Sequence, residues 1–193
     1  MNQSYIEDRT FKKLNSNKNP LIRGEYENCR FEECDLSESD LSNSTFTECE
    51  FIGCNLSLTN IAGTAFRDVK FKDCKMLGLR FDNCNDFGLN FGFENCILTH
   101  SSFYKKKIRN TSFSNSQLQE VDFVECDLTS AIFKNCDLTG ATFNSTILEK
   151  TDFRTSRNFS IDPEINRLKN SKFDSSTLAG LLSKYNLVID HKT

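Results

Sequence analysis

The sequence predicts an all-β solenoid, in which the chain coils around an axis with four sides of five residues each. Phe123, Leu128, Phe133, Leu138 and Phe143 lie five residues apart, and a small apolar residue stands two positions before each. An amphipathic helix repeats its apolar face every 3.6 residues and a strand every two. A period of five fits neither, so we infer a chain that turns a corner every five residues and points one large and one small side chain inward on each side.

A second, longer period predicts the square cross-section. All 25 large positions from Tyr26 to Phe81 and from Phe93 to Phe153 are apolar. In the first block they run aromatic, aromatic, aliphatic, aliphatic and then repeat. Large positions that lie four fives apart would therefore stack if one coil has four sides. Phe31, Phe51 and Phe71 then form one column of the core.

Charge and hydropathy argue against a general nucleic-acid binder and against a membrane-spanning protein. The chain has 193 residues and a net charge of −3, which argues against a general nucleic-acid binder. No apolar run approaches the length of about 18 residues that a transmembrane helix needs. The start, MNQSYIEDRTF, lacks the charged and apolar regions of a signal peptide. We therefore expect a cytoplasmic protein without a membrane segment.

Nine cysteines occupy the small inward position of the repeat. The sequence contains no CxxC pair, and His100 and His191 are remote from any cysteine cluster, so a metal or redox site is the less favoured interpretation. We expect reduced, buried packing residues in a reducing compartment, with no metal and no cofactor. The cysteines are Cys29, Cys34, Cys49, Cys54, Cys74, Cys84, Cys96, Cys126 and Cys136.

In chain order, residues 1–25 are predicted to be an irregular lead-in that caps the N-terminal end, because solenoids need atypical terminal units. Residues 26–174 form the β-helix, with a register break at 82–92. The next large position after Phe81 would be a carboxylate, which is costly to bury. When the five-residue repeat resumes, it is shifted by two residues. Either the break accommodates an insertion or it is a functional protrusion, made by Asn85, Asp86, Phe87 and Gly88.

Three small positions carry misfits, Leu79, Phe91 and Lys106. The first two flank the break. Lys106 belongs to the basic run Lys105–Arg109, and an inward lysine needs a partner or a local twist of the chain.

The coil opens after Phe153, because the next two large positions are Asn158 and Pro163. Residues 175–193 are predicted to form a short C-terminal α-helix, with Ser175 or Ser176 as N-cap, and then a short strand at 187–189. This tail either covers the last coil or covers it and also forms a two-fold dimer contact; its apolar surface favours the second. The residues of that contact would be Leu178, Leu181, Leu182, Tyr185, Leu187 and Ile189.

The five-residue repeats resemble those of the pentapeptide-repeat family, whose loose motif is A(D/N)LXX. Here the motif stands as CDLSESDLSNSTF, CDLTSAIF and CDLTGATF, and the resemblance covers roughly residues 26–178. It implies a right-handed quadrilateral β-helix with Phe and Leu stacked along the axis.

A narrower resemblance concerns function. The segments EYENCRFEEC and NFSIDPEINRLKNSKF, the mid-rod break and the leucine-bearing tail are similar to the quinolone-resistance branch of that family. Members of this branch are gyrase-protecting homodimers joined through the C-terminal helix. The resemblance implies binding to DNA gyrase or topoisomerase IV by DNA mimicry, without direct nucleic-acid binding. Several members carry long loops needed for protection, whereas this chain has only the short break at 85–90.

Outward acids are the candidate partner-binding surface. Duplex DNA carries one negative charge per roughly 1.7 Å, so with a net charge of −3 any mimicry is partial and local. Outward acids also keep any rod soluble, and the basic run interrupts them, so both interpretations stay open. The acids are Glu25, Glu27, Glu32, Glu33, Asp35, Glu38, Asp40, Glu48, Glu50, Glu120, Asp122, Glu125 and Asp127.

An enzyme is not expected, because a filled four-sided rod leaves no interior pocket for a substrate. Two functions remain. One is a topoisomerase-binding protein that protects against quinolones. The other is a protein-interaction scaffold with a different partner. One continuous acidic stripe would favour the first, and faces of mixed charge the second.

Overall fold

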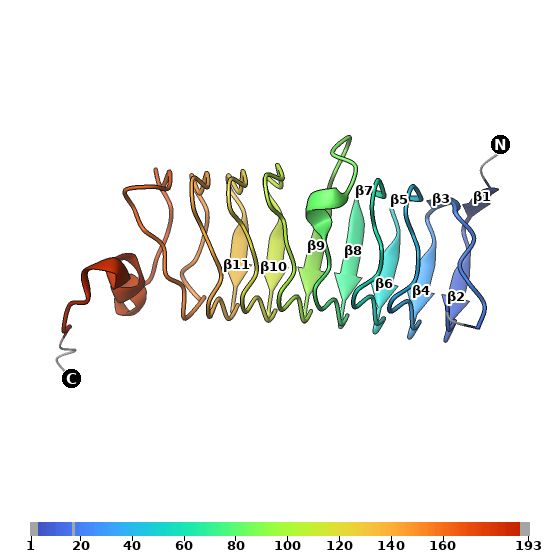
Figure 1. The fold of residues 1–193 in the computed structure, drawn as a ribbon, viewed down its shortest axis with the longest axis horizontal. Coiled ribbons are helices and arrows are strands. Elements are labelled where there is room, and N and C mark those ends of the chain that lie inside the picture. The colour runs from blue at the N-terminus through green and yellow to red at the C-terminus, as the bar shows by residue number, and fades with distance from the viewer. Residues whose placement is uncertain (1–3, 17, 190–193) are drawn as a thin grey trace.

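A computed structural model describes residues 4–16 and 18–189. The molecule is a rod in which parallel coils stack from the N-terminal end to the C-terminal end (Figure 1). Every strand pairs in parallel with the strand one coil away. The β-helix that the sequence predicts is confirmed.

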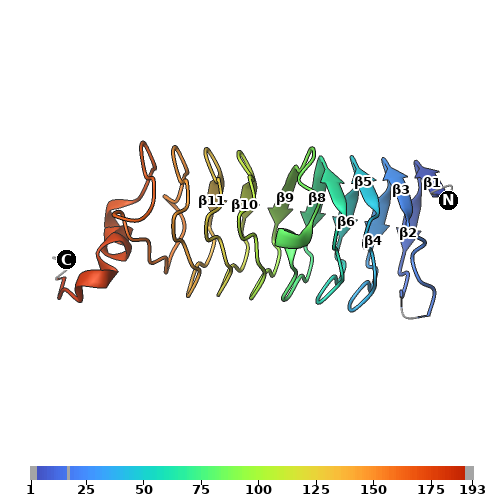
Figure 2. The same ribbon diagram turned by 45° about the horizontal axis from the view of Figure 1, so that its top comes forward.

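Two of the four faces carry short strands (Figures 1 and 2). The first face consists of β1 (Ser4–Glu7), β3 (Gly24–Glu27), β5 (Thr45–Thr47) and β7 (Ala65–Arg67). The second consists of β2 (Thr10–Lys12), β4 (Arg30–Glu32), β6 (Glu50–Ile52), β8 (Val69–Lys72), β9 (Phe91–Glu94), β10 (Ser112–Ser114) and β11 (Ile132–Lys134).

The other two faces are joined by isolated bridges and are named here after one residue of each. The Asp35 face contains the ladder Asn15, Asp35, Asn55 and Lys75. The Asp40 face contains the bridged pairs Asp40–Asn60 and Ser102–Asp122. Strands stay short because the chain turns a corner after every five residues. Corner residues adopt positive φ, as at Glu33 (52°) and Gly53 (62°).

The core holds the large side chains in stacked columns. All 25 large positions predicted from the sequence are buried, and none is more than 6 % exposed. In the predicted column of three phenylalanines, the rings of Phe31 and Phe51 are stacked with centroids 4.5 Å apart, and those of Phe51 and Phe71 are 5.2 Å apart. Such stacking adds attraction to the burial of apolar surface.

The nine cysteines are free and buried, which confirms their assignment as packing residues. Their thiols donate weak hydrogen bonds to carbonyl oxygens of the preceding coil. The Cys126 Sγ, for example, lies 2.8 Å from the carbonyl oxygen of Phe103, and the Cys136 Sγ lies 3.4 Å from that of Phe113. Burial raises the pKa of Cys126 to about 12 and that of Cys136 to about 11.

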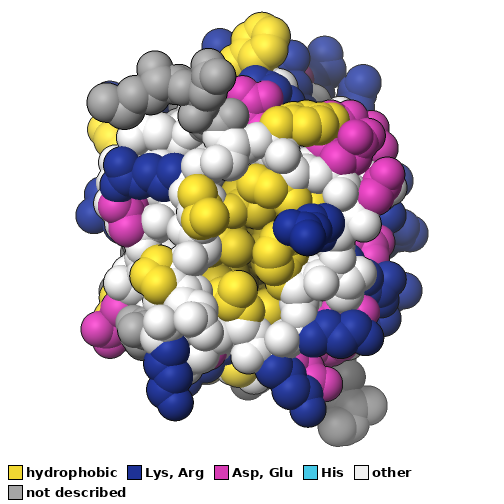
Figure 3. All heavy atoms as spheres, turned by 90° about the vertical axis from the view of Figure 1, so that its right-hand side faces the viewer, with side chains coloured by type: hydrophobic (Ala, Val, Ile, Leu, Met, Phe, Trp, Pro, Cys, Tyr) yellow, Lys and Arg dark blue, Asp and Glu magenta, His cyan; other side chains and the backbone are white. Residues whose placement is uncertain are grey.

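The expectation of an irregular lead-in is wrong for residues 4–12. Strands β1 and β2 pair in register with β3 and β4, because Ile6 and Phe11 occupy the large positions one coil before Tyr26 and Phe31. Ile6 and Phe11 are only partly buried. Figure 3 shows hydrophobic side chains at the centre of this end of the rod, ringed by polar and charged groups. The regular coil therefore begins near the N-terminus.

Within the break, the coil is longer than elsewhere. Phe71 pairs with Phe93, two positions later than the regular repeat would place its partner. The 3-10 helix η1 (Phe81–Asn83) precedes the extra length, and the segment after η1 projects from the rod (Figure 1, green). Further on, the coil opens at Asn158 and returns in phase, as shown by the bridge between Asp152 and Lys172.

The C-terminal segment is helical but differs from the prediction. It forms two 3-10 helices, η2 (Ser175–Leu181) and η3 (Ser183–Tyr185), instead of an α-helix, and its N-cap is Asp174. The first of these helices packs closely on the coil, because a Cβ on Gly180 would overlap the carbonyl oxygen of Phe159. Residues 187–189 are exposed and form no strand, since the structure places no neighbouring strand beside them.

Candidate functional site

The predicted acidic residues lie on all four faces of the rod. Glu25 and Glu27 lie on β3, Glu32 on β4, and Glu50 on β6. Asp35 lies on the face named after it, and Asp40 and Asp122 lie on the Asp40 face. Asp127 lies in a ladder between Lys107 and Ile147. Glu33, Glu38, Glu48, Glu120 and Glu125 stand at corners with positive φ.

Many of these acids are paired with basic residues of their own or the neighbouring coil. The Glu32 carboxylate lies 2.9 Å from Lys12 and 2.7 Å from Arg30. Asp127 lies 2.6 Å from Arg109, and Glu125 lies 3.6 Å from Lys105. The faces therefore carry mixed charge.

Asp127 shows how far this pairing goes. Burial raises the pKa of its carboxyl, but hydrogen bonds from Arg109 and Thr129 outweigh that effect and hold the pKa below its ordinary value. Asp127 is accordingly a structural carboxylate, held ionised by its neighbours. Glu25, Glu38 and Glu48 differ, because their carboxylates make no ion pair within residues 4–16 and 18–189.

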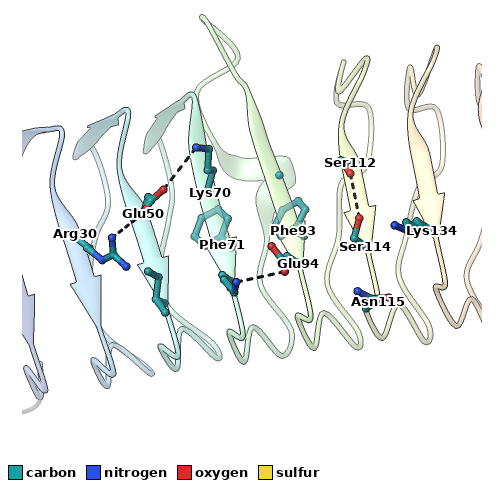
Figure 4. A pocket seen from close by; sticks show the side chains of 13 residues that line it. Arg30, Glu50, Lys70, Phe71, Phe93, Glu94, Ser112, Ser114, Asn115 and Lys134 are labelled. Atoms are coloured by element: carbon teal, nitrogen blue, oxygen red, sulfur yellow. Dashed lines mark hydrogen bonds and ion pairs between the residues drawn. The ribbon is translucent and has the colours of Figure 1, made fainter.

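The second strand face carries a ladder of alternating charge, and the residues of this ladder line part of a shallow notch (Figure 4). Glu50 lies 3.3 Å from Arg30 and 3.6 Å from Lys70. In the two coils after Lys70, Gly92 and Ser112 take the corresponding outward position. The notch has a volume of about 560 Å³, and its lining includes Gly92, Ser112, Ser114 and Lys134.

The lining of the notch contains two serines but no histidine or cysteine. His100 stands at a corner 3.2 Å from Glu120, and His191 lies outside the described residues. Among the described residues, no group of three or more His, Cys, Asp or Glu side chains is placed to hold a metal ion.

The register break and the basic run form one structure. Lys106 points inward, as its position in the repeat predicts, and its side chain is only 6 % exposed. Its Nζ donates to the carbonyl oxygen of Cys84 at 2.7 Å and to Asp86 Oδ1 at 2.6 Å. The two acceptors lie one coil before Lys106, at the start of the protrusion. Lys106 has therefore found the partner that an inward lysine needs.

Of the residues predicted for the break, Asn85, Asp86 and Gly88 hold the turn in place, and Phe87 is exposed at its end. Asn85 Oδ1 accepts from the backbone N–H of Phe87 at 2.9 Å, and Gly88 takes the positive φ of 70° that the turn requires. Phe87 is 77 % exposed. The guanidinium carbon of Arg67 lies 5.5 Å from the centre of its ring. Sequence analysis missed both Arg67 and the pairing of Lys106 with Asp86, although the spacing between the last two equals one regular coil.

The predicted dimer contact is an apolar surface at the C-terminal end of the rod. Leu178, Leu182, Tyr185, Leu187 and Ile189 are exposed. Leu181 differs from them, because it packs partly against the core. The helical turns are fixed to the last coil by polar contacts.

These polar contacts join η3 to the loop at 159–164. Lys184 Nζ lies 2.9 Å from Asp162 and 2.6 Å from Glu164, and the Tyr185 hydroxyl donates to Glu164 at 2.8 Å. The apolar side chains are thus presented on a fixed support. Between residues 4 and 189, as far as they are described, no helix has the length and apolarity that a bilayer crossing needs.

Three comparisons place the chain among known proteins. The family model "Pentapeptide repeat region" matches residues 25–92 and 89–181. No curated protein matches the chain. Among solved structures, full-length QnrB1, a plasmid-mediated fluoroquinolone resistance protein, has 14 % identity and a TM-score of 0.63, over 95 % of this chain and 100 % of QnrB1.

Two further structures are less similar. A trypsin-treated form of QnrB1 has 18 % identity and a TM-score of 0.47, over 96 % of this chain and 97 % of that one. HetL, involved in heterocyst differentiation regulation in the cyanobacterium Nostoc, has 13 % identity and a TM-score of 0.33, over 88 % of this chain and 85 % of HetL. At these identities a structural likeness shows the fold alone. Because the family model spans most of the sequence, the chain belongs to the pentapeptide-repeat family.

Proposed function

We propose that this protein is a non-enzymatic interaction rod that binds a type II topoisomerase, DNA gyrase or topoisomerase IV, and protects it from quinolones. The observation that carries the proposal is the sequence resemblance to the gyrase-protecting branch, through the mid-rod break and the C-terminal motifs. The likeness to QnrB1, over 95 % of this chain and 100 % of QnrB1 with a TM-score of 0.63, supplies the fold that this function requires.

Partial DNA mimicry would act locally on the Asp40 face. Asp40 and Asp122 lie on this face, and the corner residues Glu38, Glu120 and Glu125 border it. Hydrogen bonds from Ser42 lower the pKa of Asp40, and Arg23 lowers it further, so this carboxylate stays charged at neutral pH. Arg23 pairs with Asp40, and Arg80 lies between Asp40 and Asp122 on this face, so the mimicry would be confined to a few separate carboxylates, as the net charge of −3 also implies.

A homodimer would extend the rod. The exposed leucines and tyrosine of η2 and η3 form a self-complementary surface if two copies meet about a two-fold axis. Leu182→Glu would place a charge in that contact and should convert a dimer into a monomer, measured by light scattering after size exclusion. Leu58→Glu, at an exposed corner of the rod, is the matched control. A wild-type monomer at micromolar concentration would contradict the dimer.

A second candidate is an interaction scaffold for a different partner. The mixed charge of the faces favours it, because ion pairs such as Lys12–Glu32 and Arg109–Asp127 neutralise part of the acidic surface. The short protrusion after η1 also differs from the long loops of several gyrase-protecting relatives.

Direct binding separates the two candidates. Purified gyrase and topoisomerase IV are immobilised separately, and the full chain is passed over each in the presence and absence of a linear DNA duplex. The topoisomerase proposal predicts binding at micromolar concentration that the duplex displaces. If the folded protein binds neither enzyme, the topoisomerase proposal is contradicted and the scaffold function remains. If the protein binds an enzyme but the duplex does not displace it, DNA mimicry is contradicted, although the topoisomerase remains the partner.

A further inference from the structure

The protrusion in the register break ends in an exposed aromatic ring. Phe87 is 77 % exposed, whereas each of the other phenylalanines is buried or partly buried. A single exposed apolar residue on a surface needs no special explanation. Phe87 differs because the chain departs from its repeat to place it there, as the projecting segment after η1 shows (Figure 1).

Several contacts fix the protrusion on both sides of Phe87. Before it, the buried Lys106 binds Asp86 and the carbonyl oxygen of Cys84. After it, Leu89 packs against the core, and the backbone N–H of Asn90 donates to the carbonyl oxygen of Phe66 at 3.0 Å. The ring is therefore presented by an ordered backbone, which lowers the entropy lost when a partner binds it.

Two cations near the protrusion make no ion pair with the described residues. The Arg67 guanidinium lies against the Phe87 ring, and its Nε is buried without a hydrogen-bond partner in the described part of the chain. Lys107 lies one coil further on, directly after the lysine that anchors Asp86, and it also lacks an ion pair there. By contrast, the neighbouring Lys105 and Arg109 are already paired with acids.

We propose that Phe87, Arg67 and Lys107, here called the Phe87 knob, form a docking point for a protein partner. The phenyl ring enters an apolar pocket, and carboxylates at the rim of that pocket pair with the two cations. Rigid aromatic and arginine side chains commonly dominate the binding energy of protein interfaces. The inference rests on the proposed function, since it takes the topoisomerase as the partner.

A nucleic acid fits the knob less well. Proteins that hold single strands place several aromatic rings along a continuous basic groove. Here one ring stands alone, and Lys105 and Arg109 are neutralised by Glu125 and Asp127. Stacking of a DNA base on Phe87 is nevertheless a distinct outcome that the experiment detects.

The test measures binding of the full chain to immobilised gyrase and topoisomerase IV. Phe87→Ala removes an exposed ring and should leave the melting temperature unchanged while weakening binding about tenfold. Arg67→Gln should weaken binding and reduce its dependence on salt. Leu58→Ala is the matched control, because Leu58 is also an exposed apolar residue, at 63 %, and should bind like the wild type.

A second measurement locates the contact. A photoreactive benzoylphenylalanine at position 87 should cross-link to the topoisomerase, and the same group at position 58 should not. Wild-type affinity in Phe87→Ala, or equal cross-linking from both positions, would overturn the knob and leave the proposed function intact. Failure of the wild-type protein to bind either enzyme would overturn both. Binding to a single-stranded oligonucleotide that is lost in Phe87→Ala would replace the protein partner with a nucleic acid.

Discussion

Lys106 and Asp86 form an ion pair between a buried cation and an exposed anion. Their Nζ and Oδ1 atoms lie 2.6 Å apart, and the two side chains are 6 % and 79 % exposed. The two residues occupy neighbouring coils. The pair therefore ties the start of the protrusion to the next coil, at the place where the repeat changes register.

The first prediction concerns this pair. Asp86→Asn should lower the free energy of unfolding by about 1–3 kcal/mol, because the buried ammonium loses its anionic partner. Adding Lys106→Met should restore most of the loss, since an apolar side chain of similar length then fills the site. Urea unfolding measures both effects, and Glu38→Gln is the control. Equal stability of the single and double variants would contradict a role for the buried charge.

The second prediction concerns the stacked core. Phe123→Ala should cost about 3–5 kcal/mol, because a column of rings held by the coils cannot collapse into the hole. Phe123 is fully buried and stacks on Phe103 and Phe143 with centroid distances of 5.4 and 5.2 Å. Phe87→Ala provides the matched control, because that ring is exposed. A melting temperature near the wild-type value for Phe123→Ala would refute the structural role of the column.

The third prediction concerns the thiols. Burial raises the pKa of Cys126 and of Cys136, and the thiolate is the reactive form. We therefore expect the native protein to resist Ellman's reagent at mildly alkaline pH. All nine thiols should react once the chain is unfolded in guanidinium. Rapid modification of the native protein would show that the columns open on the time scale of the reaction.

The fourth prediction concerns acid stability. Burial raises the pKa of Asp137, but hydrogen bonds from Asn158, Thr139 and Gln119 outweigh it and lower the pKa to about 2. The folded state therefore binds this proton less readily than the unfolded chain, whose aspartates titrate near pH 4. The stabilisation is complete above about pH 4 and is lost as the pH falls through about 2.

Asp137→Asn removes that stabilisation. The variant should be less stable than the wild type at pH 7, and the difference should shrink below about pH 4. Urea unfolding at several pH values measures it, with Glu38→Gln as control. A difference that stays constant down to pH 2 would show that the charge of Asp137 is not its cause.

The interior of the rod was predictable because every coil imposes the same constraint. Each inward position meets the same neighbours one coil away, so the period of five assigns Phe31 and Phe123 alike without any knowledge of tertiary structure. The inward Lys106 followed from the same count. Its partner Asp86 stands 20 residues earlier, the length of a regular coil. The coil at the break is two residues longer, so the register places Cys84 one coil before Lys106, and the count alone did not identify Asp86.

The ends were harder to predict because local sequence and docking compete there. The leucines from 178 to 182 have the spacing of an α-helix, yet η2 is a 3-10 helix whose Gly180 lies against Phe159. The regular structure of the first coil was not predicted, because Ser16 interrupts the run of large apolar positions between Phe11 and Leu21. The use of the acidic faces depends on the shape and charge of a partner, which the sequence of this chain does not contain.

The most direct test of the proposed function is a cleavage assay with gyrase, DNA and ciprofloxacin, to which the full chain is added at increasing concentration. We predict that drug-stabilised cleavage falls as the protein concentration rises, while Phe87→Ala requires more protein for the same effect. Unchanged cleavage in the presence of folded, dimeric protein would contradict topoisomerase protection and leave the scaffold as the function of the rod.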